Sequence, residues 1–101
     1  MHAIEPIYHP MLLAGASADA DRVIEVRNPF SGALVGTVPQ AEPRQIRAAF
    51  AAAARLRPKL SRRERAEILL GTARAIARDQ DRLAQLITAE TGLCLRDALH
   101  E

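Results

Sequence analysis

Hydrophobic and polar residues are patterned in two different ways along the chain, and the change falls near residue 40. Before it, β-branched runs at 23–26 and 34–38 flank the segment 28–32 (N-P-F-S-G), whose composition is typical of a turn. After it, apolar residues recur every three or four positions, which is the spacing of one face of an α-helix. The pattern therefore predicts strands in the first part of the chain and helices in the second.

The first part divides into an arm and a hairpin. Residues 1–22 contain prolines, a glycine and a run of Ala, Ser and Asp, which predict an N-terminal arm with at most one short strand, at 11–13. Residues 23–38 are predicted to form a β-hairpin. Asn28 can accept hydrogen bonds from the backbone that follows it, and Gly32 can adopt the positive φ that closes a bulged loop.

The helical segment is predicted to span residues 43–101. Its first helix runs from Pro43, a residue favoured in a first helical turn, to about residue 56. The second begins at Ser61, because Ser61 and Glu64 match the S-x-x-E capping box, and it continues to about residue 78.

A break at 79–81 precedes a third helix, which Gly92 can end in a left-handed conformation. Residues 96–101 are predicted to be the first turns of a fourth helix that stops before it develops. The predicted fold class is therefore α/β, with an arm and a hairpin followed by three helices and a truncated fourth.

Composition narrows the class of protein. Of the 101 residues, 49% are hydrophobic and 26% charged, which excludes wholesale disorder. The single cysteine, Cys94, cannot form an internal disulfide, and the chain begins with no basic region leading into an apolar stretch. No apolar run approaches the about 20 residues that a membrane helix needs. We therefore expect a cytoplasmic protein that does not contact a membrane.

Candidate chemistry is sparse. Cys94 has only Arg96 as a nearby charge, so we expect a packed small hydrophobic residue and not a nucleophile. His2, His9 and His100 are too scattered to form a metal site with one cysteine. No pair of glycines has the spacing of a phosphate-binding loop. We therefore assign no catalytic, cofactor-binding or metal-binding residue in this chain.

A basic cluster offers an alternative function. It lies within eleven residues at a predicted helix-loop-helix junction and consists of Arg55, Arg57, Lys59, Arg62, Arg63 and Arg65. Such a cluster could contact a phosphate backbone, although Glu64 and Glu67 are available as local partners. The alternative is therefore a small basic helical module that binds a protein partner or, less favoured, nucleic acid.

The order of the motifs resembles the N-terminal quarter of the aldehyde dehydrogenase superfamily. The resemblance covers residues 11–101 and is carried by the N-P-x-x-G turn at 28–32, the S-x-x-E-R-x-x-I-L helix at 61–69 and the L-I-x-x-E-T-G ending at 86–92. Each motif alone is weak, but their order and spacing are jointly specific. After Gly92 the sequence L-C-L-R-D replaces the lysine of most members, which resembles the branch that acts on phosphonoacetaldehyde and related small anionic aldehydes.

The resemblance implies part of a cofactor-domain region in an enzyme that uses NAD or NADP to oxidise an aldehyde to a carboxylate. It also implies a homodimer or homotetramer. The family's catalytic cysteine, general base and cofactor-binding strands lie beyond residue 101, so the chain is expected to be a catalytically incomplete fragment that binds no cofactor. The residues of the family pattern that this chain does contain are expected to have structural roles: Asn28, Pro29, Gly32, Ser61, Glu64, Glu90, Thr91 and Gly92.

Overall fold

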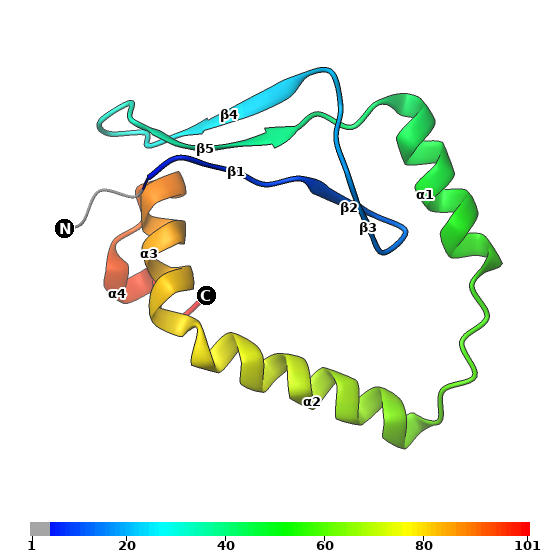
Figure 1. Cartoon of the computed structure of the whole chain (residues 1–101). Coiled ribbons are helices and arrows are strands. Elements are labelled where there is room, and N and C mark those ends of the chain that lie inside the picture. Colours follow the sequence, from blue (N-terminus) through cyan, green and yellow to red (C-terminus); the bar gives the residue numbers. More distant parts are fainter. Residues whose placement is uncertain (1–4) are drawn as a thin grey trace. The chain divides into compact units, whose positions relative to one another are not determined.

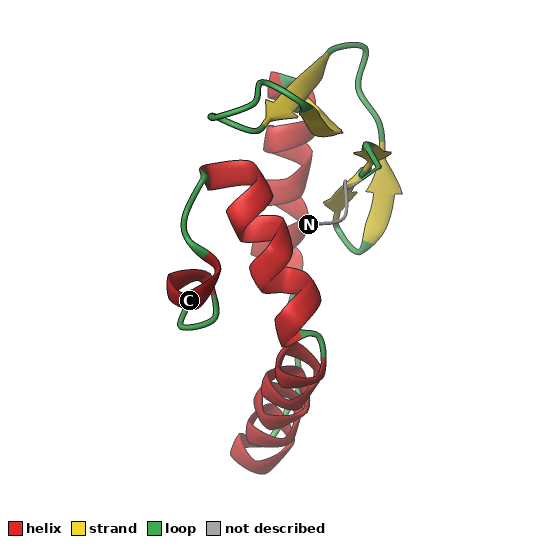
Figure 2. Ribbon diagram, turned by 90° about the vertical axis from the view of Figure 1, so that its left-hand side faces the viewer, coloured by secondary structure: helices red, strands yellow, loops and turns green. Residues whose placement is uncertain are grey.

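A computed structural model describes residues 5–101, in which strands precede helices (Figure 1). The strands are β1 (Ile7–Tyr8), β2 (Met11–Leu13), β3 (Ala16–Ala18), β4 (Val23–Arg27) and β5 (Leu34–Pro39). The helices are α1 (Pro43–Arg55), α2 (Arg62–Arg78), α3 (Gln80–Thr91) and α4 (Leu95–Ala98). Figure 2 shows the same elements coloured by type. The α/β class and the order of elements predicted from the sequence are confirmed.

The chain divides into two compact units, one that ends at Leu56 and one that begins at Arg57. The first unit contains all the strands and α1, and the second contains the other three helices. In the part of the chain that the structure describes, no helix is long and apolar enough to cross a membrane.

The central strand of the first unit is β5. It pairs antiparallel with β4 and parallel with β1, which gives the order β1-β5-β4. Because β5 has a neighbour on each side, it contains the buried positions of this unit, among them Val35 and Gly36. The register shifts at Val26 and Arg27, next to the turn that joins β4 to β5.

The predicted turn chemistry between β4 and β5 is confirmed. The side-chain oxygen of Asn28 accepts hydrogen bonds from the backbone N–H groups of Phe30, at 3.0 Å, and Ser31, at 2.8 Å. Gly32 has a φ of 71°, and its N–H donates to the carbonyl of Asn28. These hydrogen bonds satisfy the backbone of the turn from within the turn itself. Packing of Phe30 does not contribute, because this residue is 98% exposed at the tip.

The expectation of at most one short strand in the arm is wrong. β2 and β3 form a second, antiparallel hairpin, in which Leu13 is the partner of Ala16, and β1 joins the larger sheet. The tight connection is made by Ala14 and Gly15, whose φ angles are 51° and 83°. Two successive positive φ angles characterise the two-residue hairpin turn whose usual sequence is Asn-Gly or Asp-Gly. Ala-Gly lacks that signal, so the hairpin was not predicted.

α1 is attached to the arm by Gln45. The N–H of Glu42, which caps the helix, donates to Oε1 of Gln45 at 2.9 Å, and Nε2 of Gln45 donates to the carbonyl of Asp19 at 2.7 Å. One side chain therefore both closes the first turn of α1 and fixes that turn to the segment that follows β3.

The second unit is organised around helix ends. The N–H of Glu64 donates to Oγ of Ser61 at 3.1 Å and the N–H of Ser61 donates to the Glu64 carboxylate at 2.6 Å, which confirms the predicted capping box. Gly92 ends α3 with a φ of 75°, also as predicted. The buried residues are Ala84 on α3 and Ala98 on α4, two helices that contact each other. α2 has no buried residue.

Candidate functional site

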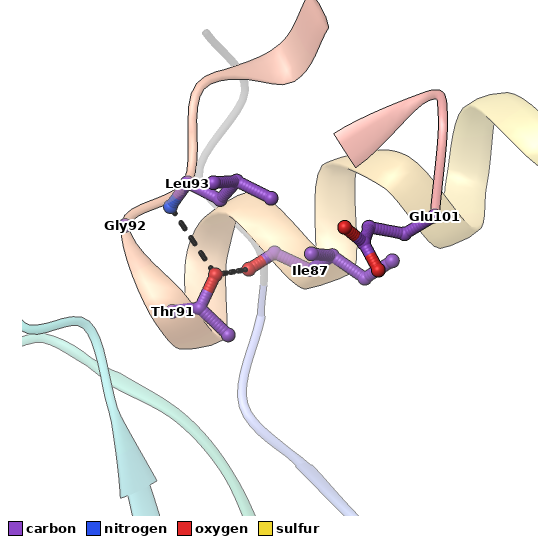
Figure 3. Close-up of a pocket in the computed structure, with 5 residues that line it drawn as sticks. All are labelled: Ile87, Thr91, Gly92, Leu93 and Glu101. Carbon is purple, nitrogen blue, oxygen red and sulfur yellow. Dashed lines mark hydrogen bonds between the residues drawn. The ribbon is translucent and has the colours of Figure 1, made fainter. Parts of the chain in front are cut away.

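A hollow of about 530 Å³ lies where α3 ends and the chain turns toward α4 (Figure 3). It is lined by Ile87, Thr91, Gly92, Leu93 and Glu101. Two of these residues belong to the E-T-G motif that the sequence singled out. The lining is mainly apolar, with the Glu101 carboxylate as its charged group.

Thr91 holds the shape of this turn. Its Oγ1 donates to the carbonyl of Ile87 at 2.7 Å and accepts from the N–H of Leu93 at 3.2 Å, as the dashed lines in Figure 3 show. The N–H of Gly92 donates to the carbonyl of Thr88 at 2.9 Å. Thr91 and Gly92 therefore each satisfy one carbonyl in the last turns of α3, those of Ile87 and Thr88, where the chain leaves the helix. These hydrogen bonds stabilise the backbone of the turn, which is a structural role.

The hollow lacks the groups that acid–base or covalent catalysis requires. A nucleophile needs a base within hydrogen-bond reach, and the lining offers one carboxylate and one hydroxyl that is already bonded on both sides. The arrangement can hold an apolar group against Ile87 and Leu93. The lining has no arrangement of side chains that could catalyse a reaction of that group.

A smaller hollow of about 200 Å³ lies at the start of α1, and its lining includes Asp21, Gln40 and Glu42. The Arg44 guanidinium, 2.6 Å from the Glu42 carboxylate, holds the pKa of Glu42 below its usual value. Glu42 therefore remains ionised near neutral pH and is no candidate proton donor. Its role is structural, because its backbone caps α1.

The expectation that Cys94 is a packed hydrophobic residue is wrong. Cys94 is exposed at the N-terminal cap of α4. Cysteine is often buried because it packs well, but Cys94 lies in the short connection between α3 and α4, before the first residue of α4. In residues 5–101 no group of three or more His, Cys, Asp and Glu side chains could hold a metal ion. His2 lies outside the described residues.

The basic cluster is divided between the two units, since Arg55 belongs to the first and the other five residues to the second. Arg63 pairs with Glu67 at 3.1 Å, as expected for residues four positions apart in a helix. Glu64 accepts from the backbone N–H of Ser61 and serves as a cap. That backbone hydrogen bond is the main reason why the pKa of Glu64 is lowered.

The polar contact between Tyr8 and Asp19 was not foreseen. The Tyr8 hydroxyl donates to the Asp19 carboxylate, and this hydrogen bond raises the pKa of Tyr8 above its ordinary value of 10.0. It joins β1 to the segment after β3, eleven residues away in sequence. No local motif signals such a pair. By contrast, the helix cap formed by Glu42 and Gln45 could have been predicted from the sequence, because the two residues have the E-x-x-Q spacing.

Comparison with known proteins gives one family. The aldehyde dehydrogenase family matches residues 16–101, which include the hairpin, all four helices and the turn at the end of α3. The match covers more than half of the chain.

The curated relatives have related names. The chain is 37% identical over 92 residues to a glutarate-semialdehyde dehydrogenase of Pseudomonas aeruginosa, covering 86% of this chain and 19% of that protein. It is 38% identical over 95 residues to the succinate-semialdehyde dehydrogenase (NADP(+)) GabD of Escherichia coli, covering 89% and 20%. It is 35% identical over 82 residues to the mitochondrial methylmalonate-semialdehyde/malonate-semialdehyde dehydrogenase (acylating) of Rattus norvegicus, covering 78% and 15%. The chain thus spans about a fifth of the length of these relatives.

Proposed function

The chain belongs to the aldehyde dehydrogenase family, and we propose that it is the N-terminal part of an NAD(P)-dependent enzyme that oxidises an aldehyde to a carboxylate. The observation that carries this proposal is the match across residues 16–101. The described residues supply hairpins, capped helices and a tightly built turn at the end of α3. The contribution of this chain is therefore scaffold, and the chemical step belongs to residues that it does not contain.

The proposed substrate is a small aldehyde that carries an anionic group. The three relatives are named for glutarate, succinate and methylmalonate or malonate semialdehydes, each of which has a carboxylate at the end opposite its aldehyde. The L-C-L-R-D sequence after Gly92 suggested phosphonoacetaldehyde, which shares the negative charge but bears it on phosphorus. The names of the relatives favour the carboxylate, so semialdehydes are the first substrates to test and phosphonoacetaldehyde is the alternative.

The starts of α1 and α2 do not favour binding of a dinucleotide cofactor. A phosphate group binds at a helix N-terminus when the backbone N–H groups there are free. In this chain the first turn of α1 is closed by Gln45 and that of α2 by Ser61 and Glu64, and the carboxylates of Glu42 and Glu64 at these helix starts repel phosphate. The Escherichia coli relative is named for NADP(+). We therefore assign the use of NAD or NADP to the complete enzyme, and binding to this chain alone is not expected.

Two further properties follow from family membership as proposals. The complete enzyme is a homo-oligomer, and it acts in the cytoplasm. Size-exclusion chromatography with light scattering and cell fractionation test these two proposals directly.

A chimera tests the scaffold role. In it, the 92-residue segment of the Pseudomonas aeruginosa enzyme that matches this chain is replaced by the corresponding residues of this chain. We expect the chimera to reduce NAD or NADP when glutarate semialdehyde is added, with the parent enzyme as the positive control. The isolated chain should give no reduced nicotinamide with any of these aldehydes. A soluble, folded chimera without activity, or turnover by the isolated chain, would contradict the proposal.

The substrate is tested separately, on the enzyme obtained by extending this chain through its own reading frame. The ratio kcat/KM for succinate, glutarate and malonate semialdehydes is compared with that for phosphonoacetaldehyde and for an uncharged aldehyde of similar length. Preference for a semialdehyde supports the proposal. Preference for phosphonoacetaldehyde selects the alternative, and preference for the uncharged aldehyde rejects both.

A further inference from the structure

We draw no further inference here: the strongest candidate, the exposed apolar face that Ala66, Leu69, Leu70, Ala73, Ile76 and Ala77 form on α2, belongs to a chain that spans about a fifth of the length of its relatives, and nothing in the structure shows what covers it.

Discussion

The carbonyl oxygen of Ile7 lies 2.6 Å from the point where a Cβ atom on Gly36 would stand. Ile7 and Gly36 are also paired in register between β1 and β5. β1 has only two residues, so it can approach the central strand this closely only because position 36 has no side chain.

Gly36→Ala is therefore expected to displace β1 from β5. Real Cβ atoms do not come so close to a carbonyl oxygen, and the weakly held β1 is the element that moves. Overpacking of this kind costs about 1–3 kcal/mol. Thermal unfolding should show the loss. Tyr8, the only tyrosine in a chain without tryptophan, should show by its fluorescence that β1 has moved.

Gly71→Ala is the matched control. A Cβ at position 71 meets no atom within 4 Å, and glycine lowers the stability of a helix interior by up to about 1 kcal/mol relative to alanine. This variant should raise the helicity and the melting temperature of α2. If both substitutions had the same effect, the close contact at Gly36 would not be the cause.

Ser61→Ala is expected to shorten α2 at its start. The substitution removes the oxygen that accepts from the N–H of Glu64, and loss of such a cap costs about 1 kcal/mol. Far-ultraviolet circular dichroism should show lower helicity at neutral pH. Ser61→Asp, which keeps an acceptor at the cap, should retain most of it. Equal helicity in Ser61→Ala and the parent chain would argue against the capping box.

The capping box of Ser61 and Glu64 also predicts that the helicity of α2 depends on pH. The pKa of Glu64 is lowered in the folded chain from its ordinary value of 4.5, so the ionised form is favoured by folding. Its contribution to stability is complete above the pKa of the unfolded chain and is lost as the pH falls through the lowered value. Helicity should therefore decrease in acid. In Glu64→Gln, which cannot ionise, that part of the decrease should be missing.

The sequence predicted those features that a few neighbouring residues determine. Asn28 and Gly32 build their turn by contacts within five residues, Ser61 and Glu64 cap a helix across three, and Gly92 ends another by its own φ. For the candidate site, the E-T-G motif was found and the hollow beside it was not. Glu101 reaches that hollow from nine residues beyond Gly92, and no spacing rule predicts such a meeting.

The remaining differences come from long-range pairing and from exposure. The parallel pairing of β1 with β5 joins residues almost thirty positions apart, and the sequence of neither strand indicates which strand it pairs with. Cys94 was expected to be buried because cysteine usually is, but burial depends on what covers a position. The Ala14-Gly15 turn was missed because alanine rarely adopts a positive φ.

Gly92→Ala is expected to loosen the end of α3. Alanine in the left-handed conformation costs about 1–2 kcal/mol, and the turn held by Thr91 depends on that conformation. Hydrogen exchange should accelerate at the N–H of Gly92, whose acceptor is the carbonyl of Thr88, and at that of Leu93. Gly92→Asn, which tolerates a positive φ, should restore most of the protection. Unchanged exchange in Gly92→Ala would mean that the turn does not rely on glycine.

Tyr8 provides a direct titration of the contact between β1 and the arm. The Asp19 carboxylate accepts a hydrogen bond from the Tyr8 hydroxyl, and this bond raises the pKa of Tyr8, so the neutral phenol is favoured by folding. The stabilisation is complete below the ordinary pKa of 10.0 and is lost as the pH rises through the raised value.

Because Tyr8 is the only tyrosine, phenolate absorbance follows this residue alone. Asp19→Asn should move the titration midpoint down toward 10.0, and Glu25→Gln, remote from the phenol in sequence and paired with Arg27, should leave it in place. A midpoint that is already ordinary in the parent chain would show that the hydrogen bond is not formed in solution.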